Sequence, residues 1–165
     1  MREFDSFGGF AEHLLGMAAI QTMAVHKALD AGAKRIEKDA RESIGTYQDA
    51  AGPFPEWAAL ADSTVKDRVR QGYAPDEPLL REGDLRDSIT HQVEGASEAV
   101  IGSNDDVAVY QELGTVHIPP RPFLGLAAVH NEHRLVRGIQ EAQALAWMGS
   151  VTLPVGLPHS EQEND

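Results

Sequence analysis

The sequence predicts an α+β fold, with a long N-terminal helix and a C-terminal helix packed on a small antiparallel sheet. Helical apolar spacing without proline runs from about residue 10 to 43 and resumes after a proline-rich segment, residues 118–122. Between them, two short apolar runs flank the turn residues 94–97, as in a β-hairpin. Helices and strands segregated along the chain in this way are typical of the α+β class.

The N-terminal helix is expected over residues 10–43. Alanine is abundant there and favours helix, and apolar residues recur at steps near three and four: Phe10, Leu14, Met17, Ala24, Ala28 and Ile36. Gly16 and Gly32 weaken the pattern locally, which leaves a kink or two consecutive helices open. Charges alternate in sign over residues 34–42, which predicts a solvated, salt-bridged face.

Loops and short elements are expected over residues 45–122. Glycine and proline cluster at 45–55 and 72–78, and a short helix capped by Ser63 or Thr64 lies between these loops. Residues 84–93 are interpreted as a strand, because Leu85, Ile89 and Val93 share one parity, and residues 99–102 as its partner. Leu85 and Ile89 are expected in the core. Gly83 is expected in a tight turn that favours positive φ.

After the hairpin, residues 104–106 are predicted to form a turn, and the apolar residues Val107, Val109 and Leu113 to lead into a loop. The C-terminal helix is expected over residues 123–147, with Pro122 in its first turn and Gly149 as its stop. Residues 151–155 suit a short strand. The domain organisation is therefore a single domain, residues 1–155, whose sheet and loops occupy about 57–122, followed by an acidic flexible tail, residues 156–165.

Composition limits the possible functions. The chain has 165 residues, a net charge of −12 and no cysteine. This excludes a disulfide framework, a thiolate zinc site and a cysteine nucleophile. No apolar run approaches the roughly 20 residues of a membrane helix, and residues 1–9 lack a signal-peptide layout, so we expect a protein without membrane partners.

Negative charge is concentrated in residues 51–120, which hold 13 Asp/Glu and 5 Lys/Arg. Two interpretations are open. Either the acids simply form a solvated surface, or they form a surface that faces DNA without binding it, since a strongly negative protein repels nucleic acid.

Three segments together resemble the phage virion-morphogenesis and tail-completion family, whose members sit at the head–tail junction or tail end. The first is Trp57-Ala58-Ala59-Leu60, followed by Ser63, Thr64 and Lys66; the second runs from Pro78 to Ile89 and contains Gly83-Asp84-Leu85-Arg86-Asp87-Ser88. The third and most distinctive is Val109-Tyr110-Gln111-Glu112-Leu113-Gly114-Thr115, then Ile118-Pro119-Pro120-Arg121-Pro122-Phe123-Leu124-Gly125. The resemblance covers roughly residues 57–128. Glu82 departs from the family pattern, which usually has Thr or Ser before Gly-Asp-Leu, and this leaves open whether a local cap or turn hydrogen bond differs here from that of the family.

The resemblance implies a structural virion protein without a cofactor, present in the host cytoplasm during assembly and then in the neck or tail end. It implies a closed ring of this chain, of six copies to match the tail tube, that contacts neck or connector proteins and tail-tube proteins while DNA passes through. The interface and structural residues expected on this basis are Trp57, Leu85, Arg86, Tyr110, Glu112, Gly114, Thr115, Pro120, Arg121, Pro122 and Phe123.

Glu112 and Arg121 carry the chemistry of the third segment. A glutamate beside a threonine is not a catalytic arrangement without a base, a metal or a nucleophile in register, so we expect Glu112 to bond backbone amides or an arginine. Arg121 offers a planar fork of donors for carboxylates. The resemblance implies that it lies near Glu112 or an acid of a neighbouring subunit, and an intrachain pair that only fixes the loop is equally open.

Two other function classes remain open. A small assembly hydrolase would use His117, His130, Glu132 and His133 as its polar centre, although their spacing lacks the layout of a zinc-protease motif. A transient assembly chaperone would be absent from the finished particle. No phosphate-binding loop, nucleophile elbow or aromatic–basic pattern for nucleic acid occurs in the sequence.

Overall fold

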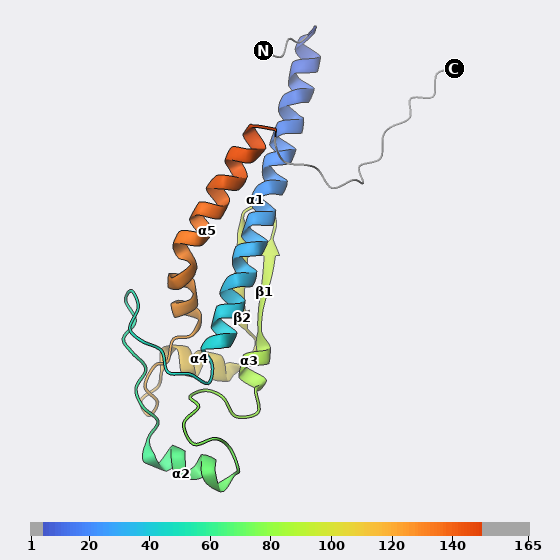
Figure 1. Cartoon of the computed structure of the whole chain (residues 1–165). Helices are drawn as coiled ribbons and strands as arrows, with labels where there is room; N and C mark the ends of the chain where they lie inside the picture. Colours follow the sequence, from blue (N-terminus) through green and yellow to red (C-terminus); the bar gives the residue numbers. More distant parts are fainter. Residues whose placement is uncertain (1–4, 150–165) are drawn as a thin grey trace, which may run out of the picture.

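The computed structural model describes residues 5–149, in which helices and strands follow the α+β order expected (Figure 1). The elements are α1 (Phe7–Ser43), α2 (Asp62–Arg70), α3 (Asp84–Ser88), β1 (Ile89–Glu94), β2 (Glu98–Ser103), α4 (Asp106–Leu113) and α5 (Leu124–Trp147). The long N-terminal helix, the C-terminal helix and the two-stranded antiparallel sheet confirm the fold class.

Helix α1 is a single helix that begins at a serine cap. The Ser6 hydroxyl accepts a hydrogen bond from the Gly9 amide at 3.1 Å, which satisfies one of the free donors of the first turn. Near its end, Arg41 pairs with Glu37 at 2.9 Å and Lys38 with Glu42 at 3.7 Å, so the predicted salt-bridged face is confirmed.

Gly32 serves packing in α1, which continues through it. A Cβ at this position would lie 2.3 Å from Leu135 Cδ1, so glycine makes room for the Leu135 side chain, which would have to move if any larger residue stood here. Helix α5 runs antiparallel to α1 along one side, and the hairpin packs on another side (Figure 1). Helix α1 is therefore the central element of the molecule.

The hairpin has the expected turn and a simple register. Ile89 pairs with Ser103 and Glu94 with Glu98, and Gly95 in the turn has φ +61°. The side chain of Arg41 ties the start of β1 to α1, because its Nε donates to the Ile89 carbonyl at 3.1 Å. The sheet is thus anchored at the end of α1 that lies near α3 and α4.

The strand predicted for residues 84–93 is wrong over its first half, since residues 84–88 form helix α3. Positions 85, 89 and 93 are four apart, and this spacing suits one face of a helix as well as one face of a strand. Gly83, at φ +101°, is the N-cap, and the Ser88 hydroxyl donates to the Leu85 carbonyl at 2.7 Å. Leu85 and Ile89 lie in the core as expected.

Two further local predictions are wrong. Residues 107–113 lie in helix α4, because the predicted turn at 104–106 is a helix start: the Asp105 side chain caps the Val107 amide at 2.9 Å. Helix α2 has Ala61 at its N-cap with no side-chain cap, so Ser63 and Thr64 lie inside the first turn.

Helix α5 begins at Leu124, one residue later than expected, with Phe123 at the N-cap and Pro122 before it. Gly149, at φ +69°, follows its end as predicted. The strand predicted for 151–155 and the tail predicted for 156–165 lie outside the described residues. The main core joins α1, α3, β1, α4 and α5, and its buried members are Ile36, Ala40, Ile44, Trp57, Leu85, Ile89, Ala108, Phe123, Leu126 and Ala127.

Candidate functional site

The candidate site is the clasp, which we define as α4, the loop 114–123 and the first turn of α5. Gly114 ends α4 at φ +73° and turns the chain back. A Cβ there would lie 2.8 Å from the Pro120 nitrogen and 2.9 Å from the Ile118 carbonyl oxygen. Because both neighbours belong to the backbone around Pro120, the clasp requires glycine at this position.

Thr115 closes the loop that follows. Its amide donates to the Ile118 carbonyl at 2.8 Å, and its hydroxyl oxygen accepts from the amides of His117 and Ile118, both at 3.2 Å. Pro119, Pro120 and Pro122 then keep the chain extended, and the Arg121 amide between them donates to the Gln111 carbonyl at 2.7 Å. The loop is therefore held to α4 along its length.

Glu112 joins α4 to the start of α5. One carboxylate oxygen accepts from the amides of Phe123 at 2.8 Å and Leu124 at 3.0 Å, and the other accepts from the Gly125 amide at 2.8 Å. These amides belong to the N-terminal turn of α5, where helix geometry leaves donors free and the helix dipole favours negative charge. The expectation that Glu112 bonds backbone amides is confirmed.

Arg121 is buried, with 5% of its surface exposed, and it makes no salt bridge within residues 5–149. The prediction of an Arg121–Glu112 pair is wrong, because the guanidinium reaches back to the segment after Trp57: Nη2 donates to the carbonyls of Ala58 at 2.9 Å and Ala59 at 3.4 Å. Its Nε is enclosed without a hydrogen-bond partner among the residues that the structure describes. Burial lowers the pKa of Arg121 from its ordinary value.

The clasp brings most of the sequence-predicted residues together. Phe123 is fully buried and Pro122 is buried, while Trp57 contributes to the same core as Leu85. Arg86 lies apart from them on α3 and pairs with the adjacent Asp87 at 3.2 Å. Tyr110 is 52% exposed, and Pro120 and Thr115 are also at the surface. The exposed members are therefore available to a partner, whereas the buried ones hold the fold.

Sequence reasoning missed two residues that organise the neighbouring loops. Arg68, 3% exposed, donates from Nε to the Ala74 carbonyl at 2.7 Å and from Nη2 to the Leu80 carbonyl at 2.6 Å. The Tyr47 hydroxyl donates to Asp76 at 2.7 Å and accepts from the Leu60 amide at 3.1 Å. Burial, and then the bond to Asp76, raises the pKa of Tyr47. Their partners are distant loop groups, so no local pattern marked them.

A cavity of about 640 Å³ lies beside the clasp. Arg68, Gln111, His117 and Arg121 are among the residues that line it. The other members of the hypothetical hydrolase centre, His130, Glu132 and His133, are exposed on α5 and do not line this cavity. No group of three or more His, Asp or Glu side chains within residues 5–149 is arranged to hold a metal ion.

In the described part of the chain, no helix combines the length and the apolar character needed to cross a membrane.

Compared with known proteins, the chain matches no family model, no curated protein and no solved structure.

Proposed function

We propose that the chain is a non-enzymatic structural subunit of a long-tailed phage particle or a phage-derived particle, built into the ring that joins head to tail or completes the tail end. The resemblance of residues 57–128 to the virion-morphogenesis and tail-completion family supports this proposal. In the finished ring, six copies surround the channel and contact neck and tail-tube proteins.

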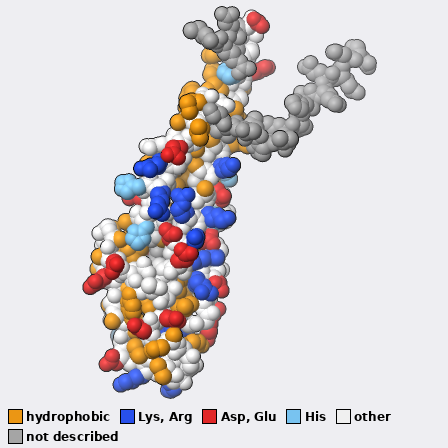
Figure 2. Space-filling model, viewed as in Figure 1, with side chains coloured by type: hydrophobic (Ala, Val, Ile, Leu, Met, Phe, Trp, Pro, Cys, Tyr) orange, Lys and Arg blue, Asp and Glu red, His pale blue; other side chains and the backbone are white. Residues whose placement is uncertain are grey.

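The observation that carries a structural role is the exposure of large apolar side chains on separate parts of the molecule. On α1 and the end of α5, Phe7 is 85% exposed, Leu15 72%, Trp147 66% and Met148 69%. On and after α4, Leu113 is 73% and Val116 95% exposed. Figure 2 shows apolar side chains on both the upper and the lower part of one face. Exposed apolar patches mark interaction surfaces, and a ring subunit needs one on each side.

The use of polar side chains in the clasp supports the same role. Both carboxylate oxygens of Glu112 are occupied by backbone amides, and the guanidinium of Arg121 holds two carbonyls. These side chains bond to backbone groups of the same chain and so stabilise its local conformation. They fix the orientation of α4 and α5 relative to each other, which a subunit of a closed ring must keep constant from copy to copy.

A particle experiment tests this function. Immunogold labelling of purified particles is expected to place the chain at the head–tail joint, and disruption of its gene is expected to leave filled heads and separate tails. Normal joined particles that lack the chain would contradict the proposal and would favour the transient chaperone. Hydrolytic activity with stoichiometric metal in the purified chain would favour the hydrolase instead.

A further inference from the structure

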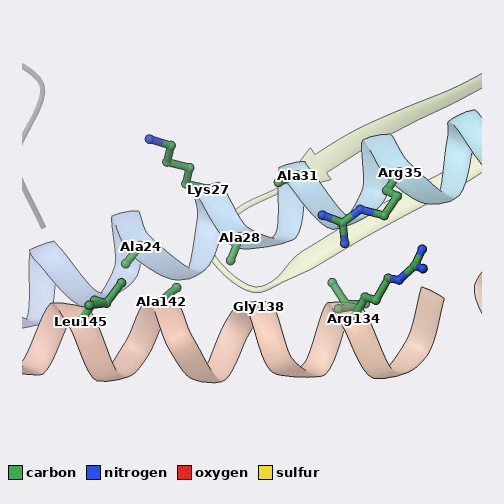
Figure 3. Close-up of a pocket in the computed structure, with 11 residues that line it drawn as sticks. Ala24, Lys27, Ala28, Ala31, Arg35, Arg134, Gly138, Ala142 and Leu145 are labelled. Carbon is green, nitrogen blue, oxygen red and sulfur yellow. The ribbon is translucent and has the colours of Figure 1, made fainter.

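A shallow apolar groove of about 320 Å³ runs between α1 and α5 (Figure 3). Small side chains form much of its floor and leave a furrow between the two helices: Ala24, Ala28, Ala31, Gly32, Gly138 and Ala142. The volume is at the small end of the range of about 300–1,000 Å³ typical of ligand pockets. The groove therefore suits a few side chains of a protein partner.

Two arginines lie at one end of this groove without acidic partners. Arg35 from α1 and Arg134 from α5 both line it, and both are exposed (Figure 3). Neither makes a salt bridge within residues 5–149. Lys27 also lines the groove, although its side chain points away from α5 in Figure 3. Figure 2 shows Lys and Arg side chains gathered halfway along the molecule, over α1 and α5. The groove thus combines an apolar floor with uncompensated positive charge.

Helix α4 carries the complementary surface. Asp106, Val109, Tyr110 and Leu113 lie at positions i, i+3, i+4 and i+7 and so share one face of the helix. Val109 is 54%, Tyr110 52% and Leu113 73% exposed, and the Asp106 side chain is exposed with no bond in the described part of the chain. This face is apolar with one carboxylate at its N-terminal end.

A chain cannot fill its own groove with this helix, because α4 lies at the opposite end of α5 from much of the groove (Figure 1). We propose that the exposed face of α4 in one copy docks into the α1–α5 groove of the next copy, with Asp106 directed at Arg35 and Arg134. The apolar side chains enter the furrow as a helix ridge enters the groove of a packed helix pair.

This contact joins two different surfaces, so it is heterologous. Repeated from copy to copy, it closes into a ring if the rotation between copies allows. The inference rests on the proposed function for its biological setting, but the contact is defined by the two surfaces alone. It also removes Asp106 from the acids available to line a central channel.

Disulfide trapping tests the contact, because the natural chain has no cysteine. Gly138→Cys places a thiol in the groove, and Val109→Cys places one on α4. A mixture of the two variants at high concentration is expected to give a covalent dimer, while each variant alone gives little. Gly102→Cys, in a glycine of β2 outside the groove whose Cβ would also meet no atom within 4 Å, is the matched control partner for Val109→Cys. Equal trapping by the control, or preferred trapping of Gly138→Cys with itself, would overturn the docking.

Filling the groove gives a second test that spares the fold. A Cβ at Gly138 meets no atom within 4 Å, so we expect Gly138→Leu to keep the fold, checked by circular dichroism, and to occupy the groove. We expect self-association, measured by sedimentation, to weaken at least tenfold, about 1.4 kcal/mol. Gly102→Leu, outside the groove, is expected to leave self-association unchanged, and unchanged association of Gly138→Leu would overturn the proposal. If the dimers are trapped as expected but the chain is absent from the head–tail joint of purified particles, the proposed function is refuted and the docking contact still stands.

Discussion

Replacement of Glu112 by alanine removes three hydrogen bonds between α4 and the start of α5. The carboxylate accepts three amide hydrogen bonds, at 2.8, 3.0 and 2.8 Å. A hydrogen bond to a charged group contributes about 1.5–3 kcal/mol, and the three share one carboxylate, so their contributions do not add fully. We therefore expect a loss of about 3 kcal/mol in the free energy of unfolding. For a chain of this length, that corresponds to a fall of about 6–12 °C in melting temperature.

Urea and thermal unfolding followed by circular dichroism measure this loss. Glu112→Gln keeps one acceptor oxygen and loses the charge, so it is expected to fall between the wild type and Glu112→Ala. Glu132→Ala is the matched control, because Glu132 is an exposed glutamate of α5 with no bond in the described structure, and its stability is expected to stay within about 0.5 kcal/mol of wild type. Equal stability of Glu112→Ala and Glu132→Ala would refute the role assigned to Glu112.

Three further predictions concern Arg121, Tyr47 and the acidic surface. Arg121→Ala is expected to give soluble protein, because Ala58 and Ala59 are exposed and their carbonyls can bind water, but to join heads and tails poorly. Arg121→Lys should not rescue joining fully if Arg121 makes a bidentate contact in the ring. A normal infectious yield from the alanine variant would show that the side chain is dispensable. Because the pKa of Tyr47 is raised in the folded protein, the hydroxyl's contribution to stability is complete below about pH 10 and is lost as pH rises through the folded pKa. Unfolding of wild type and of Tyr47→Phe across this pH range checks the prediction. A difference in unfolding free energy between the two proteins that stays constant with pH would contradict it. The free chain is expected to show no DNA binding at physiological salt. In the ring, some of the acids of residues 76–106 should line the channel or its rim. A basic or neutral channel wall, with all these carboxylates on the outer surface, would exclude this role.

Long-range periodicity made the helices predictable. The apolar spacing of residues 10–43 and 123–147 matches α1 and α5 within a few residues, because both helices bury a continuous stripe against each other. Short elements were harder: the four-residue spacing of Leu85, Ile89 and Val93 is common to helix and strand. An aspartate in a turn signal, Asp105, also proved to be a helix cap. Such ambiguities are settled by tertiary packing, which the local sequence does not show.

The candidate site was predictable where its chemistry is local. Glu112 precedes the proline-rich segment by a few residues. Its carboxylate can only accept hydrogen bonds, which indicated backbone amides as partners, and the structure supplies these amides at the start of α5. The partners of Arg121 were not predictable, since the carbonyls of Ala58 and Ala59 are 63 and 62 residues away in the chain. The groove is lined by small residues of two helices, Gly32 and Gly138 among them, and their juxtaposition follows only from the packed structure.

Reconstruction of purified particles by electron microscopy tests the central claim, that the chain is a structural subunit of the head–tail or tail-end ring. We predict density for α1, α5 and the hairpin repeated around the particle axis at this joint, with the long α1 helix as its most recognisable feature. A single copy of the chain away from the axis, or a complete joint built without it, would contradict the account.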